Sequence, residues 1–167
     1  IAIEIAGRKV GPGHPCFIIA EAGVNHNGNV ELAKRLVDVA VEAGVDAVKF
    51  QTFKAERVVS AAAPKAKYQL QTTDPDESQL DMIRHLELSP NAFREIQVYC
   101  HDRGILFMST PFDHGSADLL DDLKVPAFKI GSGEITNLPL LAHVARKGRP
   151  MIVSTGMSTL DDVAAAV

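Results

Sequence analysis

Short apolar runs alternate with amphipathic segments along this chain, and this alternation restricts the possible folds more than any other feature. Apolar residues with helical spacing follow each run after a turn. The predicted strands are residues 17–22, 46–51, 105–109, 127–130 and 151–154, and the predicted helices are residues 30–43, 90–102, 116–123, 138–146 and 159–167. Strands that alternate with helices through short connections indicate a parallel sheet covered by helices.

Capping residues mark several of these boundaries. Asn29 is a candidate N-cap of the first helix, and Ser89-Pro90 is typical of a helix start. Ser158 and Asp161 have the spacing of a capping box before the last helix. Residues 3–10 are predicted to form a small hairpin, whereas residues 52–80 have no predicted element.

Two architectures accommodate five strand–helix units: an open doubly wound sheet and a (β/α)8 barrel. An open sheet would place a glycine-rich phosphate turn after its first strand, and no GxGxxG motif is present. The spacing from Ile18 to Ala47 is about 30 residues, close to the ~250 residues of a barrel divided by eight. We therefore predict a TIM barrel. Five units cannot close it, so residues 1–167 are expected to be the N-terminal part of a longer protein.

Composition and charge exclude several classes of function. The formal net charge is -4, and the basic patch of a nucleic-acid-binding protein is missing. No apolar run reaches the ~18 residues of a membrane span, and no secretory leader is recognisable. Cys16 and Cys100 lie far apart without a CxxC motif, which predicts reduced thiols and a cytoplasmic location.

Each predicted strand has polar or small residues at its carboxyl end, where barrel enzymes have their active sites. Glu21 ends the first strand, and Lys49 and Gln51 share one face of the second because strand side chains alternate. The remaining strand ends contain Ser109-Thr110-Pro111, Lys129 with Gly131-Ser132-Gly133-Glu134, and Ser154-Thr155-Gly156.

Lys49 and Lys129 are the most informative of these residues. A single lysine in a strand is usually exposed at an edge, but two lysines in parallel strands beside Glu21 suggest a shared site. Burying an ammonium group is costly without a partner, so two converging lysines favour a dianion such as phosphate. The amides around Ser132 could complete a phosphate cradle, and Glu21 and Glu134 supply acid–base capacity.

The histidines give no comparable pattern. His85, His101, His114 and His143 are predicted to lie on the surface or on helix faces, and no HExxH spacing is present. A GxSxG nucleophile motif is absent as well. The sequence therefore predicts no metal ligands within these residues.

Seven segments in order resemble the sialic acid synthase family, the N-acetylneuraminate synthases. They cover nearly the whole chain and are similar to the neuraminate and legionaminate branches more than to the pseudaminate branch. The segments are IIAEAGVNHNG, VKFQTF, APKAKYQ, ESQLDMIRHLELS, STPFD, PAFKIGSGEITNLPLL and IVSTGM.

The resemblance implies a TIM barrel followed by an antifreeze-like domain, which would lie beyond residue 167. It implies condensation of phosphoenolpyruvate with an N-acetylated amino sugar, and a homodimer as the full-length protein. It also implies a divalent metal, typically Mn²⁺, whose histidine ligands would follow residue 167. The implied site residues are Lys49, Thr110, Lys129 and Ser132 for phosphoenolpyruvate, Gln51 and Glu134 for the sugar, Glu21 for catalysis, and Asn25 and His26 as supporting residues.

Three alternatives remain open from the sequence. The protein could be a legionaminate-type synthase, or a Schiff-base aldolase that uses Lys49 or Lys129 on the same fold. The chain could also be a catalytically incomplete fragment that binds ligands or partners only, with little turnover by itself.

Overall fold

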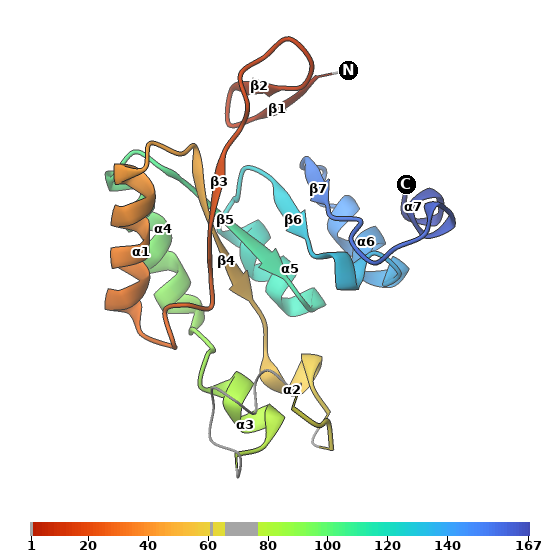
Figure 1. The fold of residues 1–167 in the computed structure, drawn as a ribbon. Coiled ribbons are helices and arrows are strands. Elements are labelled where there is room, and N and C mark those ends of the chain that lie inside the picture. Colours follow the sequence, from red (N-terminus) through yellow and green to blue (C-terminus); the bar gives the residue numbers. More distant parts are fainter. Residues whose placement is uncertain (1, 61, 66–76) are drawn as a thin grey trace.

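The structure is a computed structural model that describes residues 2–60, 62–65 and 77–167. In this part of the chain, five parallel strands follow one another, each with a helix after it (Figure 1). The strands are β3 (Ile19–Gly23), β4 (Ala47–Thr52), β5 (Leu106–Pro111), β6 (Phe128–Ile130) and β7 (Met151–Val153). The ladders pair β3 with β4, β4 with β5, and β6 with β7, and β6 contacts β5. The five predicted strands are confirmed.

The predicted helices are also confirmed, with small shifts at their ends. They are α1 (Val30–Glu42), α4 (Pro90–Asp102), α5 (His114–Asp122), α6 (Leu138–Ala145) and α7 (Leu160–Ala166). Asn29 and Ser89 cap α1 and α4 as expected, since their side chains accept hydrogen bonds from Leu32 N and Ala92 N. No helix in the described part of the chain is long and apolar enough to cross a membrane.

The predicted cap of α7 is wrong by one residue. Thr159, rather than Ser158, is the N-cap, and Asp162 rather than Asp161 accepts a hydrogen bond from Thr159 N at 2.8 Å. Both pairs have the same spacing in the sequence, so only the backbone conformation distinguishes them.

Two short helices between β4 and α4 were not predicted. They are α2 (Ala55–Val58) and α3 (Gln79–Arg84). Ser78 caps α3 locally, since Asp81 N donates to its hydroxyl at 3.0 Å. The amide of Ala55 in α2 instead donates to the distant carboxylate of Glu87 at 2.6 Å. A four-residue helix that depends on such a contact cannot be found from local periodicity.

The helix-facing side of the sheet is apolar and forms the main core. Val48 and Phe50 of β4 are fully buried and face the helices. The Phe50 ring stacks on Phe107 at 5.8 Å between centroids, and Phe93 from α4 meets Phe107 edge-on at 6.4 Å. Because strand side chains alternate, this packing directs Lys49 and Gln51 to the opposite, inner face.

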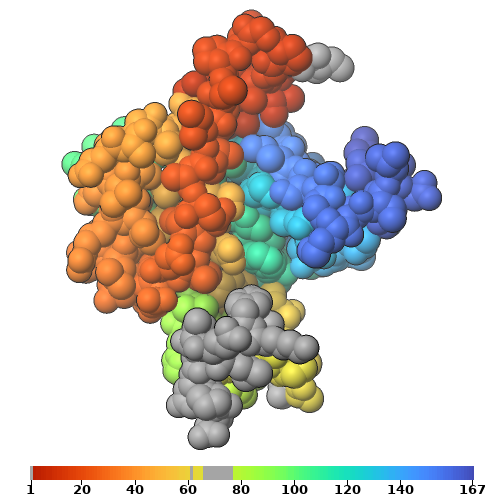
Figure 2. Space-filling view, viewed as in Figure 1, coloured from red at the N-terminus to blue at the C-terminus, as the bar shows by residue number. Residues whose placement is uncertain are grey.

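A hairpin covers the amino ends of the strands on the inner face. It consists of β1 (Ile3–Ile5) and β2 (Arg8–Val10), which pair antiparallel, as predicted for this segment. Ile5 is fully buried against Ala47, Met108 and Ala127. The hairpin projects at the end of the molecule opposite to α2 and α3 (Figure 2). The inner face is therefore apolar at the hairpin end, which leaves the carboxyl ends for polar groups.

His26 lies in the turn between β3 and α1 and is fully buried. Its ring centroid is 6.1 Å from that of Phe50, which belongs to the helix-facing core. Its Nδ1 accepts a hydrogen bond from Gly28 N at 3.0 Å, and burial lowers the pKa of the imidazole. This position gives the imidazole a structural role in the turn between β3 and α1.

Replacing His26 by Asn should reduce the acid sensitivity of folding. Below the ordinary imidazole pKa of 6.5, the unfolded chain binds the proton first because the folded pKa is lower. Stability is therefore lost as the pH falls from 6.5 toward the folded value. We expect the free energy of unfolding, measured with urea, to decrease more between pH 7.5 and 5.5 in the wild type than in His26→Asn.

The exposed His101 provides the matched control for this measurement. His101→Asn should leave the pH dependence of the wild type unchanged, because the His101 side chain is 90% exposed and folding does not remove it from water. Equal pH dependence of the wild type and His26→Asn would contradict the expectation. At pH 7.5 the loss of packing on Phe50 should cost His26→Asn about 1–3 kcal/mol.

Candidate functional site at the carboxyl ends of the strands

An ion pair between Lys49 and Glu21 forms the centre of the candidate site. The two residues are partners in the β3–β4 register, and the Lys49 ammonium donates to Oε2 of Glu21. The Lys49 side chain is 11% exposed, whereas that of Glu21 is 52% exposed. The lysine is therefore held inside the sheet while the carboxylate remains accessible.

Lys129 lies close to this pair from the next part of the sheet. Its Nζ donates to the carbonyl oxygen of Ile130 at 2.6 Å and to the hydroxyl of Ser154 at the end of β7. Burial lowers the pKa of Lys129, the positive charge of Lys49 lowers it further, and Glu21 opposes the shift. The charges of Lys49 and Glu21 are thus close enough to act on Lys129. Two ammonium groups with one carboxylate leave a net positive charge suited to an anion.

Thr110 and Ser132 lie at neighbouring strand ends. Thr110 is buried opposite Gln51 in the β4–β5 register. A β-carbon built on Gly131 would lie 3.9 Å from Cγ2 of Thr110, so the turn after β6 passes close to this threonine. Ser132 begins the 3-10 helix Ser132–Glu134, and its hydroxyl lies 3.5 Å from the β-carbon position of Gly156. The hydroxyls of Thr110 and Ser132 thus border the ends of β5, β6 and β7.

Gln51 and Glu134 line a cavity of about 460 Å³ that extends from these strand ends to α2 and α3. Oε2 of Glu134 accepts a hydrogen bond from Nδ2 of Asn137 at 2.7 Å, and Asn137 also caps α6. This contact orients the carboxylate of Glu134. The side chain of Gln51 has no hydrogen bond to another described residue, which leaves its amide available to a ligand.

Asn25 and His26 are not joined to this group of residues by any described contact. Asn25 is exposed on the β3–α1 turn, and its backbone amide donates to the Ala22 carbonyl at 3.1 Å. His26 packs against Phe50 on the other face of β4. Of the nine predicted site residues, the structure therefore places the other seven on the inner face or at the strand ends.

Gly23 and Asn137 support the site and were not predicted, whereas Ser154 was predicted only as a polar strand end. Gly23 has a φ of 55°, and a β-carbon there would lie 3.1 Å from Oε1 of Glu21 and 3.5 Å from Nε2 of Gln51. A glycine at the end of a strand is a recognisable indication of such close approach. Ser154 and Asn137 orient Lys129 and Glu134 through contacts that depend on the tertiary structure.

The described residues do not fit a manganese site. No group of three or more His, Cys, Asp or Glu side chains in them could hold a metal ion. His85 contacts Glu77 at 2.9 Å and His143 contacts Asp118 at 2.6 Å, so each of these histidines is hydrogen-bonded to a single carboxylate. We therefore derive no chemical step through a metal from this part of the chain.

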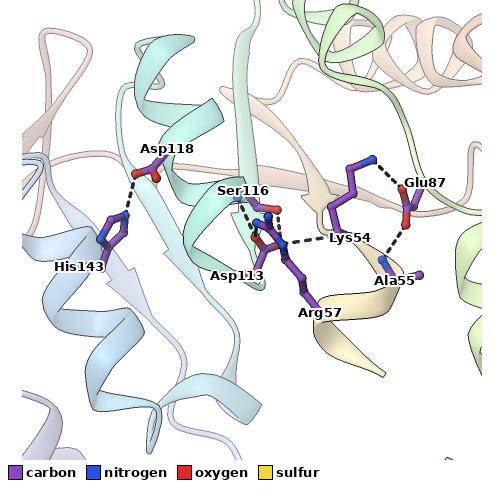
Figure 3. A network of polar contacts seen from close by, with 8 residues as sticks. All are labelled: Lys54, Ala55, Arg57, Glu87, Asp113, Ser116, Asp118 and His143. Carbon is purple, nitrogen blue, oxygen red and sulfur yellow. Dashed lines mark hydrogen bonds and ion pairs between the residues drawn. The ribbon is translucent and has the colours of Figure 1, made fainter. Parts of the chain in front are cut away.

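A polar network fixes α2 beside the site (Figure 3). The carboxylate of Glu87 accepts from Ala55 N at 2.6 Å and from Lys54 Nζ at 2.7 Å. The carboxylate of Asp113 accepts from Nη1 of Arg57 at 2.9 Å and from Lys54 N at 3.3 Å. Hydrogen bonds from Arg57 and Ser116 hold the pKa of Asp113 below its usual value, although burial opposes the shift. The network joins the segments after β4 and β5.

Gly115 makes room for this network. A β-carbon on Gly115 would lie 2.2 Å from Nη1 of Arg57, so a larger residue would displace the guanidinium from Asp113.

The segment APKAKYQ, one of the seven that resemble the sialic acid synthase family, is described only in part. Its residues 63–65 lie within the described part of the chain, and its residues 66–69 lie outside it.

The fold is shared with known synthases of sialic acids. Residues 36–167 match the family model described as the NeuB family. The solved structure of an N-acetylneuraminic acid (sialic acid) synthetase from Leptospira borgpetersenii superposes with a TM-score of 0.86 at 30% identity, and the match covers 99% of this chain and 53% of that chain. The chain is thus a part of a TIM barrel of the sialic acid synthase type, with about five βα units.

Curated relatives extend this similarity at the sequence level. The N,N'-diacetyllegionaminic acid synthase of Campylobacter jejuni is 51% identical over 151 residues, which are 90% of this chain and 45% of the relative. The human N-acetylneuraminate-9-phosphate synthase is 42% identical over 159 residues, 93% of this chain and 43% of the relative. The chain spans about half the length of these relatives. With a family match over most of its residues, it belongs to the NeuB family.

Proposed function

We propose that the protein containing this chain condenses phosphoenolpyruvate with an N-acylated amino sugar, such as N-acetylmannosamine, to give a nonulosonic acid and phosphate. The observation that supports this proposal most strongly is the convergence of Lys49 and Lys129 beside Glu21 at the strand ends. The membership of the chain in the NeuB family agrees with it. The C. jejuni and human relatives are named as synthases of two different nonulosonic acids.

In this proposal the two lysines bind the anionic substrate. Phosphoenolpyruvate carries a carboxylate and a phosphate, and charge-assisted hydrogen bonds to ammonium groups are among the strongest that a protein can offer. Lys49 and Lys129 hold these groups, and the hydroxyls of Thr110 and Ser132 add hydrogen bonds. The net positive charge of the strand ends stabilises the bound dianion.

In the proposed reaction the Glu21 carboxylate accepts a proton from the attacking water. A bond forms between C3 of phosphoenolpyruvate and the aldehyde carbon of the open-chain sugar, and the aldehyde oxygen takes up a proton to become a hydroxyl. Positive charge then develops at C2, where water adds and gives a proton to the Glu21 carboxylate. Cleavage of the C2–O bond releases phosphate and leaves the new keto group. The exposed carboxylate of Glu21 is suited to this role because water can reach it.

Gln51 and Glu134 hold the amino sugar. Both residues line the cavity beside the lysines, and an amide with a carboxylate can bond several hydroxyls at once. The hydrogen bond from Asn137 orients Glu134 before the substrate binds. Such orientation lowers the entropic cost of placing the aldehyde against phosphoenolpyruvate.

A Schiff-base aldolase is the second candidate, and one observation favours it. The lowered pKa of Lys129 raises the fraction of neutral amine, which is the nucleophile in Schiff-base formation. Lys129 nevertheless lies beside a second ammonium group and donates two hydrogen bonds, which suits anion binding better than attack on a carbonyl. The experiments below distinguish the two reactions.

Replacing Lys49 by Met should strongly impair the condensation in the full-length protein. The substitution removes one of the two anion-binding charges and leaves the Glu21 carboxylate without its partner. We expect kcat/KM for phosphoenolpyruvate to fall roughly 100-fold or more, measured as phosphate release. Lys9→Met in the exposed hairpin is the matched control and should retain wild-type activity. Activity of Lys49→Met within a few-fold of the wild type would refute the assignment.

The pH dependence should report the charge of Lys129. As the pH rises through the lowered pKa of Lys129, the ammonium group loses its proton. The neutral amine then binds the anionic substrate less tightly. We expect kcat/KM for phosphoenolpyruvate to decline at a lower pH than an ordinary lysine with a pKa of 10.5 would allow. Lys129→Arg keeps its charge at alkaline pH and should shift the decline upward. An identical alkaline limb in both proteins would exclude Lys129 as the titrating group.

Borohydride trapping separates a synthase from an aldolase. Reduction in the presence of pyruvate converts a Schiff base into an irreversible amine adduct on the lysine. We expect no adduct on Lys49 or Lys129 by mass spectrometry of the full-length protein, because the lysines act as cations in the proposed reaction. An adduct on either residue would instead establish the aldolase chemistry.

A further inference from the structure

A second cavity lies on the helix-facing side of the strand ends. Its volume is about 240 Å³, and we call it the outer cavity. Thr52, which lines it, lies on the same face of β4 as the helix-facing Val48 and Phe50, because strand side chains alternate. None of the nine predicted site residues, all of which the structure describes, lines this space. Its lining residues are Thr52, Phe53, Lys54, Arg57, Leu88, Pro90, Gly115, Ser116 and Leu119.

The outer cavity shares a wall with the cavity of about 460 Å³ beside the two lysines, here called the inner cavity. The Phe53 ring lines both cavities. In α2, Arg57 lines the outer cavity, whereas the next residue, Val58, lines the inner one. The segment 53–58 therefore separates the space that the proposed reaction uses from a space for which that reaction has no role.

The lining of the outer cavity combines hydrocarbon with two cations. The Lys54 side chain is 46% exposed, and that of its partner Glu87 is 15% exposed. The Arg57 side chain is 58% exposed, and that of its partner Asp113 is 8% exposed. Because the carboxylates are the buried members of both ion pairs, the groups that a ligand reaches first are cationic. The apolar lining residues are Phe53, Leu88, Pro90 and Leu119.

The Arg57 guanidinium retains hydrogen-bond donors for a ligand. Only its Nη1 has a hydrogen-bond partner, Asp113, among the described residues. The remaining N–H groups belong to a planar fork that matches the geometry of a carboxylate. Lys54 Nζ, which donates to Glu87 at 2.7 Å, can add a second charge-assisted bond to the same ligand. The outer cavity thus suits one carboxylate group joined to an apolar body.

We propose that the outer cavity is an effector site for a small carboxylate with an apolar body. Arg57 and Lys54 bind the carboxylate, whereas Leu88 and Leu119 contact the hydrocarbon, which gains free energy by leaving water. Since a cavity of about 150 Å³ holds benzene, the outer cavity accommodates an anion of the size of benzoate. Binding at this site goes beyond the proposed function and does not depend on it.

A bound effector acts on the inner cavity through α2 (Figure 3). Its carboxylate competes with Glu87 for Lys54. It also competes with Asp113 for Arg57. When these contacts weaken, the segment 53–58 is held less firmly, and a sugar in the inner cavity must order it at an entropic cost. The effector therefore lowers the affinity for the sugar, and the sugar lowers the affinity for the effector by the same factor.

Calorimetry on the full-length protein with benzoate, benzamide and acetate tests the site. Benzoate has the charge and the ring, benzamide has the ring without the charge, and acetate has the charge without the ring. We expect benzoate to bind about tenfold more tightly than either of the others, measured as Kd. Benzoate binding should persist in Lys49→Met and with saturating phosphoenolpyruvate, because Lys49 and Lys129 do not line the outer cavity.

Two substitutions change the lining directly. Leu119→Trp fills the outer cavity and should abolish benzoate binding. Arg57→Gln removes the guanidinium and should reduce the preference for benzoate over benzamide to about threefold or less. Arg94→Gln is the matched control and should bind benzoate like the wild type, since Arg94 is exposed on α4 and does not line the cavity. Thermal melts report whether each variant is folded, and Arg57→Gln, which changes an exposed side chain, decides the test if Leu119→Trp unfolds.

Steady-state kinetics test the coupling, which rests on the proposed function. Saturating benzoate should raise KM for N-acetylmannosamine about fivefold. KM for phosphoenolpyruvate should change less, because Phe53 and Val58 line the inner cavity and the lysines do not belong to the segment 53–58. Benzoate should have no effect on Leu119→Trp. In calorimetry, N-acetylmannosamine should weaken benzoate binding by the same factor.

The outcomes separate this inference from the proposed function. Benzoate that phosphoenolpyruvate displaces, that requires Lys49, or that binds folded Leu119→Trp as well as the wild type would overturn the effector site. Equal affinity of the wild type for benzoate and benzamide would overturn it too, because the cations would then have no role. Binding at the outer cavity without phosphate release from any sugar would support the effector site and refute the condensation. Binding with an unchanged KM for the sugar would support the site and overturn its coupling to the inner cavity.

Discussion

Burial of Lys49 in β4 and partial burial of Lys129 in β6 form the constraint on which the rest of this structure depends. Removing two ammonium groups from water is costly unless partners compensate. Glu21 neutralises Lys49, whereas the partners of Lys129 among the described residues are a carbonyl and a hydroxyl oxygen. Burial and the charge of Lys49 lower the pKa of Lys129. The strand ends thus hold more positive than negative charge, and an anion would relieve the repulsion that remains.

The strands can position these groups because their inner face is apolar at the amino ends and polar at the carboxyl ends. At the amino ends, Ala47 and Met108 pack against Ile5 of the hairpin and exclude water. At the carboxyl ends, the same strands present Lys49, Gln51 and Thr110. Phe50 and its neighbours anchor β4 from the helix side. The apolar packing on both sides therefore supplies the rigidity with which the polar groups are positioned.

The segments after β4 and β5 complete the surroundings of the site. Glu87 satisfies the first amide of α2, and Asp113 caps α5 while it binds Arg57. Both carboxylates thus serve a helix end and a neighbouring segment at once, which fixes the position of α2 relative to β5.

The local sequence pattern was sufficient to predict the strands, most of the helices and the polar residues at the strand ends. The period of two in β4 predicts that Lys49 and Gln51 share a face, and the register with Glu21 and Thr110 agrees with it. Local pattern failed for α2, whose first amide is satisfied by a residue far along the chain, and for the choice between Ser158 and Thr159.

The sequence by itself determined which residues face inward and which chemistry the strand ends offer, because side-chain alternation and turn residues are local properties. Only the tertiary structure decided which of these groups meet. The approach of Lys129 to Lys49, the bond from Asn137 to Glu134, and the apolar cavity beneath α2 and α3 join residues distant in sequence. Such contacts depend on how strands and helices pack, and packing is a property of the whole fold.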